Sequence, residues 1–95
     1  MFLHITHAEY KHDFMIEVAF NDGRSGVADL SSVLKGSVFE ELKDVAKFSE
    51  FELDKELNTI VWKNGADLAP EFIYYCAFKD VSELAEQFKA WSYVN

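Results

Sequence analysis

The sequence contains one cysteine, one proline and few basic residues. Cys76 alone cannot form a disulfide within the chain or supply a four-cysteine metal site. No apolar run approaches the roughly 18 residues that a membrane-spanning helix needs. The first seven residues lack a basic stretch followed by a long apolar segment, so no signal peptide is expected and the protein is predicted to be cytoplasmic.

The shortage of basic residues also restricts the partners. Nine Lys and Arg against seventeen Asp and Glu give a net charge of −8. Such a surface repels phosphate backbones and anionic membranes, so nucleic acid and membrane binding are not expected. The charge by itself keeps a small domain in solution, and it also suits a small basic partner protein.

What the chain does contain is enough apolar material for one domain. Hydrophobic residues make up 49% of the 95 positions and aromatic residues 16%, with nine phenylalanines. A chain of this length forms one domain with a thin core. Disorder is not expected, because disordered chains lack such an aromatic content.

The first thirty residues are predicted to form an antiparallel meander. Strands are expected at about 2–10, 14–20 and 24–29, because apolar and polar residues alternate with period two, most clearly in the second. The Asp22-Gly23 pair between the last two is typical of a hairpin turn. A second hairpin is expected further on, from strands at 51–54 and 58–62.

Short capped helices are predicted between the two hairpins. Ser31 is expected to cap the first, and Ser37 with Glu40 fits a reciprocal capping box for the second. Asp44 is expected to cap the third. The corresponding helical segments are 32–35, 38–43 and 45–49.

The C-terminal part is predicted to be helical. Pro70 suits the first position of a helix that runs to about Phe78, and Asp80 with Glu83 is expected to cap a second helix. An apolar stripe follows at helical spacing: Val81, Leu84, Ala85, Phe88 and Trp91. We expect this stripe to pack on the same chain, and the alternative is a homodimer contact through the C-terminal helix.

Residues 62–71 read Trp-Lys-Asn-Gly-Ala-Asp-Leu-Ala-Pro-Glu, and here the chain resembles the bacterial family named domain of unknown function 2442. Further segments resemble it in the expected order: 20–23, 29–36, 38–42 and 58–62. The resemblance covers about residues 3–75 and implies a small α+β fold with a mixed or antiparallel sheet. Ala69 stands where relatives commonly have Asp, and the tail extends past the usual domain end.

Family context implies two further possibilities. Some relatives join this domain to a DNA-binding helix-turn-helix. Members are often encoded beside another small protein, an arrangement that suggests toxin–antitoxin pairs. Residues 66–95 of this chain hold two basic and five acidic side chains, the reverse of what a recognition helix needs, so a DNA-binding regulator is disfavoured.

The most family-like segment is also the candidate recognition loop, with Trp62, Asn64, Gly65, Asp67 and Glu71. In the functional interpretation Trp62, Asn64 and Asp67 are exposed and contact a partner. In the structural interpretation, which we favour, Asn64-Gly65 makes a turn, Asp67 accepts backbone N–H groups and Trp62 closes the core.

No catalytic residue and no cofactor are predicted. Cys76 lies in an apolar helical run and is expected to be a core thiol, and the sequence has no nucleophile elbow, P-loop or dinucleotide fingerprint. The histidines His4, His7 and His12 lie in the first hairpin, where Glu9 or Asp13 could join them. No metal site is predicted from them, because their spacing matches no metal-binding motif.

The sequence therefore predicts an α+β fold with an antiparallel-rich sheet of about five strands, short helices in the middle and a C-terminal helical extension. The family-like part is 1–75 and the extension 76–95. The first hypothesis is a non-enzymatic interaction module for a small basic protein, as the antitoxin-like or regulatory member of a two-gene pair. The alternative is a small-molecule or enzymatic domain that uses the 62–71 loop, which predicts a concave pocket containing Asp67 and a titratable neighbour.

Overall fold

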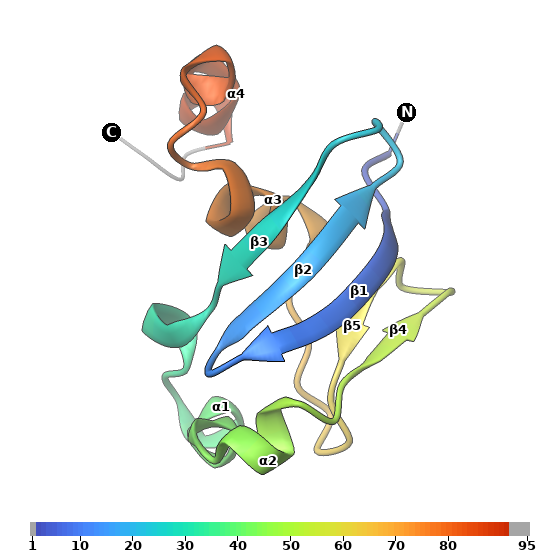
Figure 1. Cartoon of the computed structure of the whole chain (residues 1–95), viewed down its shortest axis with the longest axis vertical. Coiled ribbons are helices and arrows are strands. Elements are labelled where there is room, and N and C mark those ends of the chain that lie inside the picture. The colour runs from blue at the N-terminus through green and yellow to red at the C-terminus, as the bar shows by residue number, and fades with distance from the viewer. Residues whose placement is uncertain (1, 92–95) are drawn as a thin grey trace.

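The computed structural model describes residues 2–91, which form two antiparallel sheets and several short helices (Figure 1). The first sheet has the order β1-β2-β3, with β1 at Ile5–His12, β2 at Met15–Phe20 and β3 at Ser25–Asp29. The second is a hairpin of β4, Glu52–Asp54, and β5, Thr59–Val61. All five predicted strands are present in this α+β fold.

The prediction of one sheet of about five strands is wrong. In the described residues a single backbone hydrogen bond, from Ile5 N–H to the Asn58 carbonyl at 3.0 Å, joins β1 to the second hairpin. Strands β4 and β5 have only three residues each, and the register of β1 shifts between Ile5 and His7 and between Tyr10 and His12. Such irregularities increase the twist of a strand, which turns its edge away from continuous pairing.

The predicted Asp-Gly turn joins β2 to β3. The Phe20 N–H donates to the Arg24 carbonyl at 2.9 Å, and the Asp22 carboxylate accepts from the Arg24 N–H at 2.9 Å. Gly23 has φ of +90°, a left-handed conformation that costs little without a Cβ. The tip is tied to α3 (Pro70–Phe78), because the Tyr74 hydroxyl donates to Asp22 Oδ2 at 2.7 Å.

Short helices connect the two sheets, as predicted, but two expected caps are absent. Ser31 lies inside its 3₁₀ turn, and its N–H and hydroxyl both donate to Asp29 Oδ1, at 3.0 and 2.7 Å. Gly36 is the N-cap of α1 and no side chain caps that helix, so the Ser37–Glu40 capping box does not form. The segments are a 3₁₀ turn at Ser31–Val33, α1 at Ser37–Glu40, a 3₁₀ turn at Glu41–Lys43 and α2 at Val45–Phe48.

The third predicted cap is confirmed. Asp44 is the N-cap of α2, and its Oδ1 accepts from the Ala46 N–H at 3.0 Å. Pro70 stands in the first turn of α3, and that helix ends at Phe78, also as predicted. A 3₁₀ turn at Ser82–Leu84 leads into α4, Ala85–Ala90. The N-cap of the 3₁₀ turn is Val81 with no side-chain bond, so the predicted Asp80–Glu83 cap is wrong.

Helix α3 packs against the sheet on one side only. Phe78 lies over β3, so closely that a Cβ added to Gly26 would stand 2.8 Å from Phe78 Cε1. Phe20 makes edge-to-face contacts with Tyr74 and Phe78, with ring centroids 4.9 and 5.9 Å apart. In Figure 1 the three strands stand in front and α3 lies behind them.

The C-terminal stripe packs on the same chain. Leu84 and Phe88 are buried in the core that also holds the inward residues of β2, and Val81 and Trp91 pack partly against it. Ala85 is exposed, contrary to its place in the predicted stripe. Because Leu84 and Phe88 are covered by their own chain, they are removed from contact with a second copy. Residues 92–95 of the predicted extension lie outside the described residues.

Candidate functional site

The loop after β5 forms the predicted Asn-Gly turn. The Gly65 N–H donates to the Trp62 carbonyl at 3.0 Å, and the Trp62 N–H donates to the Ala66 carbonyl at 2.9 Å. Gly65 has φ of +91°, so this position needs glycine. The turn therefore reverses the chain within a few residues and places the Asn64 side chain at its tip.

Trp62 is buried, not exposed as the recognition interpretation requires. Its side chain has 3% exposure, and its Nε1–H donates to the Phe48 carbonyl at 2.8 Å. That carbonyl ends α2, where helix carbonyls lack partners within the helix. The surrounding rings are Phe39, Phe48 and Phe51. The structural interpretation of Trp62 is confirmed: it closes the core and caps a helix end.

Asn64 is exposed, yet its side chain is fully engaged within the chain. Its Nδ2 donates to the Val38 carbonyl at 2.8 Å and to Glu41 Oε2 at 3.0 Å. Its Oδ1 accepts from the Ala66 N–H at 3.1 Å. The amide thus holds the turn closed and ties it to the helical segment after β3, so a partner would have to displace these bonds to reach it.

Asp67 and Glu71 lie outside this network. Asp67 is exposed and pairs through its backbone with Val61, but within residues 2–91 its carboxylate accepts no hydrogen bond, contrary to the sequence expectation. The loop after it is held instead by the Thr59 hydroxyl, which donates to the Leu68 carbonyl at 2.6 Å. Glu71 is half-buried in the first turn of α3. Whether these residues take part in recognition stays a prediction.

A hollow of about 340 Å³ lies beside the turn. Trp62 and Leu42 supply buried apolar surface, and both signs of charge surround it. The lining residues are Glu41, Leu42, Lys47, Glu50, Trp62, Lys63 and Asn64. The hollow includes Trp62, Lys63 and Asn64 of the loop and titratable neighbours, but Asp67 does not line it, so the prediction of a pocket containing Asp67 is wrong.

A second candidate surface is one that the sequence analysis did not identify. In β2 the side chains of Ile16, Val18 and Phe20 are buried, so the alternate residues face the other side of the sheet. Strand pairing aligns these with neighbours on β1 and β3 in three rows. We call this side the open face; it is formed by His7, Glu9, His12, Met15, Glu17, Ala19, Ser25, Val27 and Asp29.

The open face combines carboxylates with apolar side chains. Its middle row is Glu9, Glu17 and Val27, and Val27 is 40% exposed. Asp29 is the last residue of the third row. Its carboxylate accepts hydrogen bonds from the Ser31 backbone N–H, which has the larger effect, and from the Ser31 hydroxyl, and both lower the pKa of the Asp29 carboxyl below its usual value. This carboxylate therefore stays ionised at neutral pH.

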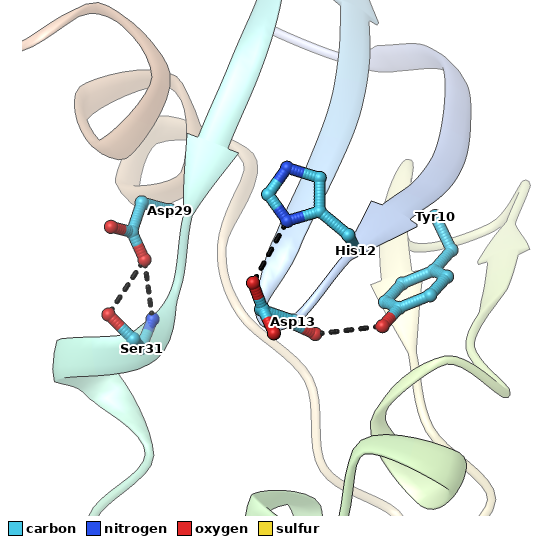
Figure 2. A network of polar contacts seen from close by, with 5 residues as sticks. All are labelled: Tyr10, His12, Asp13, Asp29 and Ser31. Carbon is cyan, nitrogen blue, oxygen red and sulfur yellow. Dashed lines mark hydrogen bonds and ion pairs between the residues drawn. The ribbon is translucent and has the colours of Figure 1, made fainter.

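Figure 2 shows the lower end of this face, at the β1–β2 turn. His12 Nδ1 lies 3.0 Å from Asp13 Oδ2, and the Tyr10 hydroxyl donates to the Asp13 carbonyl at 3.0 Å. Asp13 has φ of +46°, and these two contacts hold it there. Asp29 and Ser31 form a separate pair on the neighbouring strand end in the same view.

The model of the family described as protein of unknown function (DUF2442) matches residues 5–79. The chain belongs to the DUF2442 family. The resemblance in the sequence is thereby confirmed, and both the turn at 62–66 and the open face lie within the matched residues. No curated protein and no solved structure matches the chain.

In this DUF2442 chain the family match ends one residue after α3. Leu84 and Phe88, which fill the core beyond that point, come from the segment outside the match. The residues that follow the family domain thus complete its core. Within residues 2–91 no helix combines the length and the apolar character needed to span a bilayer.

Cys76 of this DUF2442 domain lies on α3 and packs partly against the core. Burial raises the pKa of its thiol to about 11, so at neutral pH it is protonated and a weak nucleophile. The Cys76 side chain packs against the core, as predicted, but it is half-buried and not fully enclosed.

Proposed function

We propose that this DUF2442 domain is a protein-interaction module whose open face binds a basic segment of a partner protein. The observation that carries the proposal is the middle of that face, where Glu9, Glu17 and Asp29 surround the apolar side chains of Met15 and Val27. Helix α3 packs on the other side of this sheet and leaves the open face uncovered by it.

Charge complementarity favours a basic occupant. The chain carries a net charge of −8, and the three carboxylates of the open face exceed the lysines beside them, which are Lys11 near Glu9 and Lys79 near Asp29. Lys11 lies 3.6 Å from Glu9, and Glu17 forms no ion pair within residues 2–91. Lys and Arg of a partner would pair with these carboxylates, and an apolar residue between them would cover Val27.

The same charges disfavour nucleic acid, because phosphates would be repelled at this surface. The family context supports the finer proposal that the partner is encoded beside this protein, with this domain as the antitoxin-like or regulatory member of the pair. The proposal places the complex in the cytoplasm, a reducing compartment in which a lone thiol such as Cys76 persists.

The test is co-expression with the products of the adjacent genes, followed by calorimetry on the purified partner. The double variant Glu9→Lys with Glu17→Lys should weaken binding by about tenfold or more, because it reverses the charge where the partner docks. The matched control is Glu56→Lys with Glu86→Lys, which makes the same change in net charge on exposed residues outside the open face.

The control variant should bind within about twofold of the wild-type chain, apart from a weak effect of net charge that added salt removes. Equal losses in both double variants would show that net charge and not the open face decides binding. If no neighbouring gene product binds at all, the interaction hypothesis loses its support.

The hollow beside Trp62 favours a second candidate, a binding site for a small molecule. Trp62 and Leu42 supply the apolar wall, and the charged lining consists of two lysines and two glutamates, of which Lys63 and Glu50 pair with each other at 3.2 Å. Lys47 forms no ion pair within residues 2–91, so it is the cation that would bind the carboxylate of a small molecule with an apolar part. Because the indole borders the hollow, such a ligand should change the tryptophan fluorescence. Lys47→Ala should remove the response to a panel of small carboxylic acids, and an unchanged response would exclude this site.

A further inference from the structure

Three metal-binding side chains converge on the upper part of the open face. Strand pairing places Glu9 directly opposite Glu17, and His7 lies two residues before Glu9 on β1. One ligand atom from each of the three lies within 4.8 Å of the other two. We propose that His7, Glu9 and Glu17 form a site for a divalent transition-metal ion, of the kind that zinc represents.

The distances suit such an ion after small side-chain rotations. Zinc binds imidazole nitrogen and carboxylate oxygen at about 2.0–2.2 Å, so tetrahedral ligand atoms stand roughly 3.3–3.6 Å apart. The three donors approach this separation already, and all are on the surface with freedom to adjust. Water would complete the coordination from the solvent side.

The electrostatics favour a cation at this position. Like charges directly opposite each other on paired strands repel, and Glu9 and Glu17 are such a pair. In the described residues neither His7 nor Glu17 has a hydrogen bond or ion pair that would occupy its donor atoms, and Glu9 has only Lys11 at 3.6 Å. A divalent ion would remove the repulsion and bind all three groups.

The donor set selects the class of metal. An imidazole with two carboxylates suits zinc and neighbouring transition metals, whereas magnesium and calcium prefer oxygen ligands alone. Zinc binding needs no partner protein, so its test is independent of the proposed function, but a bound ion would compete with a basic partner for Glu9 and Glu17. Nonspecific attraction of cations to the negative surface would not depend on His7, because a neutral imidazole contributes no negative charge. Dependence of zinc binding on His7 therefore distinguishes a specific site from such attraction.

The test is isothermal titration of the tag-free, full-length chain with zinc chloride in a buffer that does not bind zinc, with magnesium chloride in parallel. One equivalent of zinc should bind, and magnesium should not saturate a site. His7→Ala and Glu17→Gln should each lower the zinc affinity by about tenfold or more, because each removes one of three protein ligands. His12→Ala is the matched control.

His12 is an exposed histidine of the same strand that has its own carboxylate neighbour, Asp13, and it should be replaceable without loss of zinc binding. All three variants alter exposed or half-exposed side chains, and circular dichroism would verify that they fold. Absence of saturable zinc binding would overturn the inference. So would zinc binding that His7→Ala leaves unchanged, or that His12→Ala reduces as strongly.

Discussion

The burial of Trp62 leads to a quantitative prediction for Trp62→Phe. Phenylalanine keeps an aromatic ring but cannot donate the 2.8 Å hydrogen bond to the Phe48 carbonyl. A buried polar group left without its partner costs about 1–3 kcal/mol. The smaller ring also leaves a void, and at about 24 cal/mol per Å³ a void of about 40 Å³ costs about 1 kcal/mol.

The two losses together predict that Trp62→Phe lowers the free energy of unfolding by about 2–4 kcal/mol. For a domain of this size that corresponds to a fall in Tm of about 8–30 °C. Urea unfolding followed by far-ultraviolet circular dichroism measures the change, with the slope m compared between variants. Leu57→Ala is the control, because Leu57 is 53% exposed and its loss should cost less than about 0.5 kcal/mol.

A loss below about 1 kcal/mol for Trp62→Phe would refute the reasoning, because it would mean that the indole neither caps α2 nor fills the core. A loss equal to that of Leu57→Ala would lead to the same conclusion. If a Trp62→Phe variant stayed stable but bound the partner more weakly, the result would support a role of Trp62 in recognition.

Three further predictions concern the contacts around α3. Gly26→Ala should destabilise by about 1–3 kcal/mol in urea unfolding, because the new Cβ meets Phe78 at 2.8 Å, and Phe78→Leu in the same chain should recover part of the loss. Ala69→Asp should stabilise by about 0.5–1 kcal/mol, since Ala69 is the N-cap of α3 and offers no side-chain acceptor; a destabilised variant would contradict this. Alkylation of Cys76 by iodoacetamide at pH 8 should be much slower than alkylation of free cysteine, and its rate should rise as the pH approaches about 11. A rate at pH 8 equal to that of free cysteine would refute the raised pKa of Cys76.

Local features of the chain were predictable because their causes are local. Asp22-Gly23 makes its turn through one carboxylate and one left-handed glycine, both adjacent in sequence. Asp44 caps α2 through an N–H two residues away. One failed cap also has a local cause. The Ser31 N–H and hydroxyl donate to the carboxylate of Asp29, two residues earlier, so Ser31 does not cap the turn that follows.

The site was less predictable because its neighbours are distant in sequence. Asn64 looked free for recognition, but Val38 and Glu41, more than twenty positions away, accept its hydrogen bonds. The spacing of the histidines along the chain matches no metal-binding motif, whereas the pairing of Glu9 with Glu17 is set by strand register. Register across a hairpin depends on where each bulge falls, and the bulges in β1 have no clear signal in the sequence.

By itself, the sequence determined the order of the strands, the turns between them, the start of α3 at Pro70 and membership of the DUF2442 family, because alternation, turn residues and motif order are properties of neighbouring residues. Only the tertiary structure decided that the strands divide into two sheets, that Trp62 lies inside, and that one side of β1–β3 stays uncovered with its carboxylates outward. These outcomes depend on which elements pack against each other, and packing joins residues that the chain keeps apart.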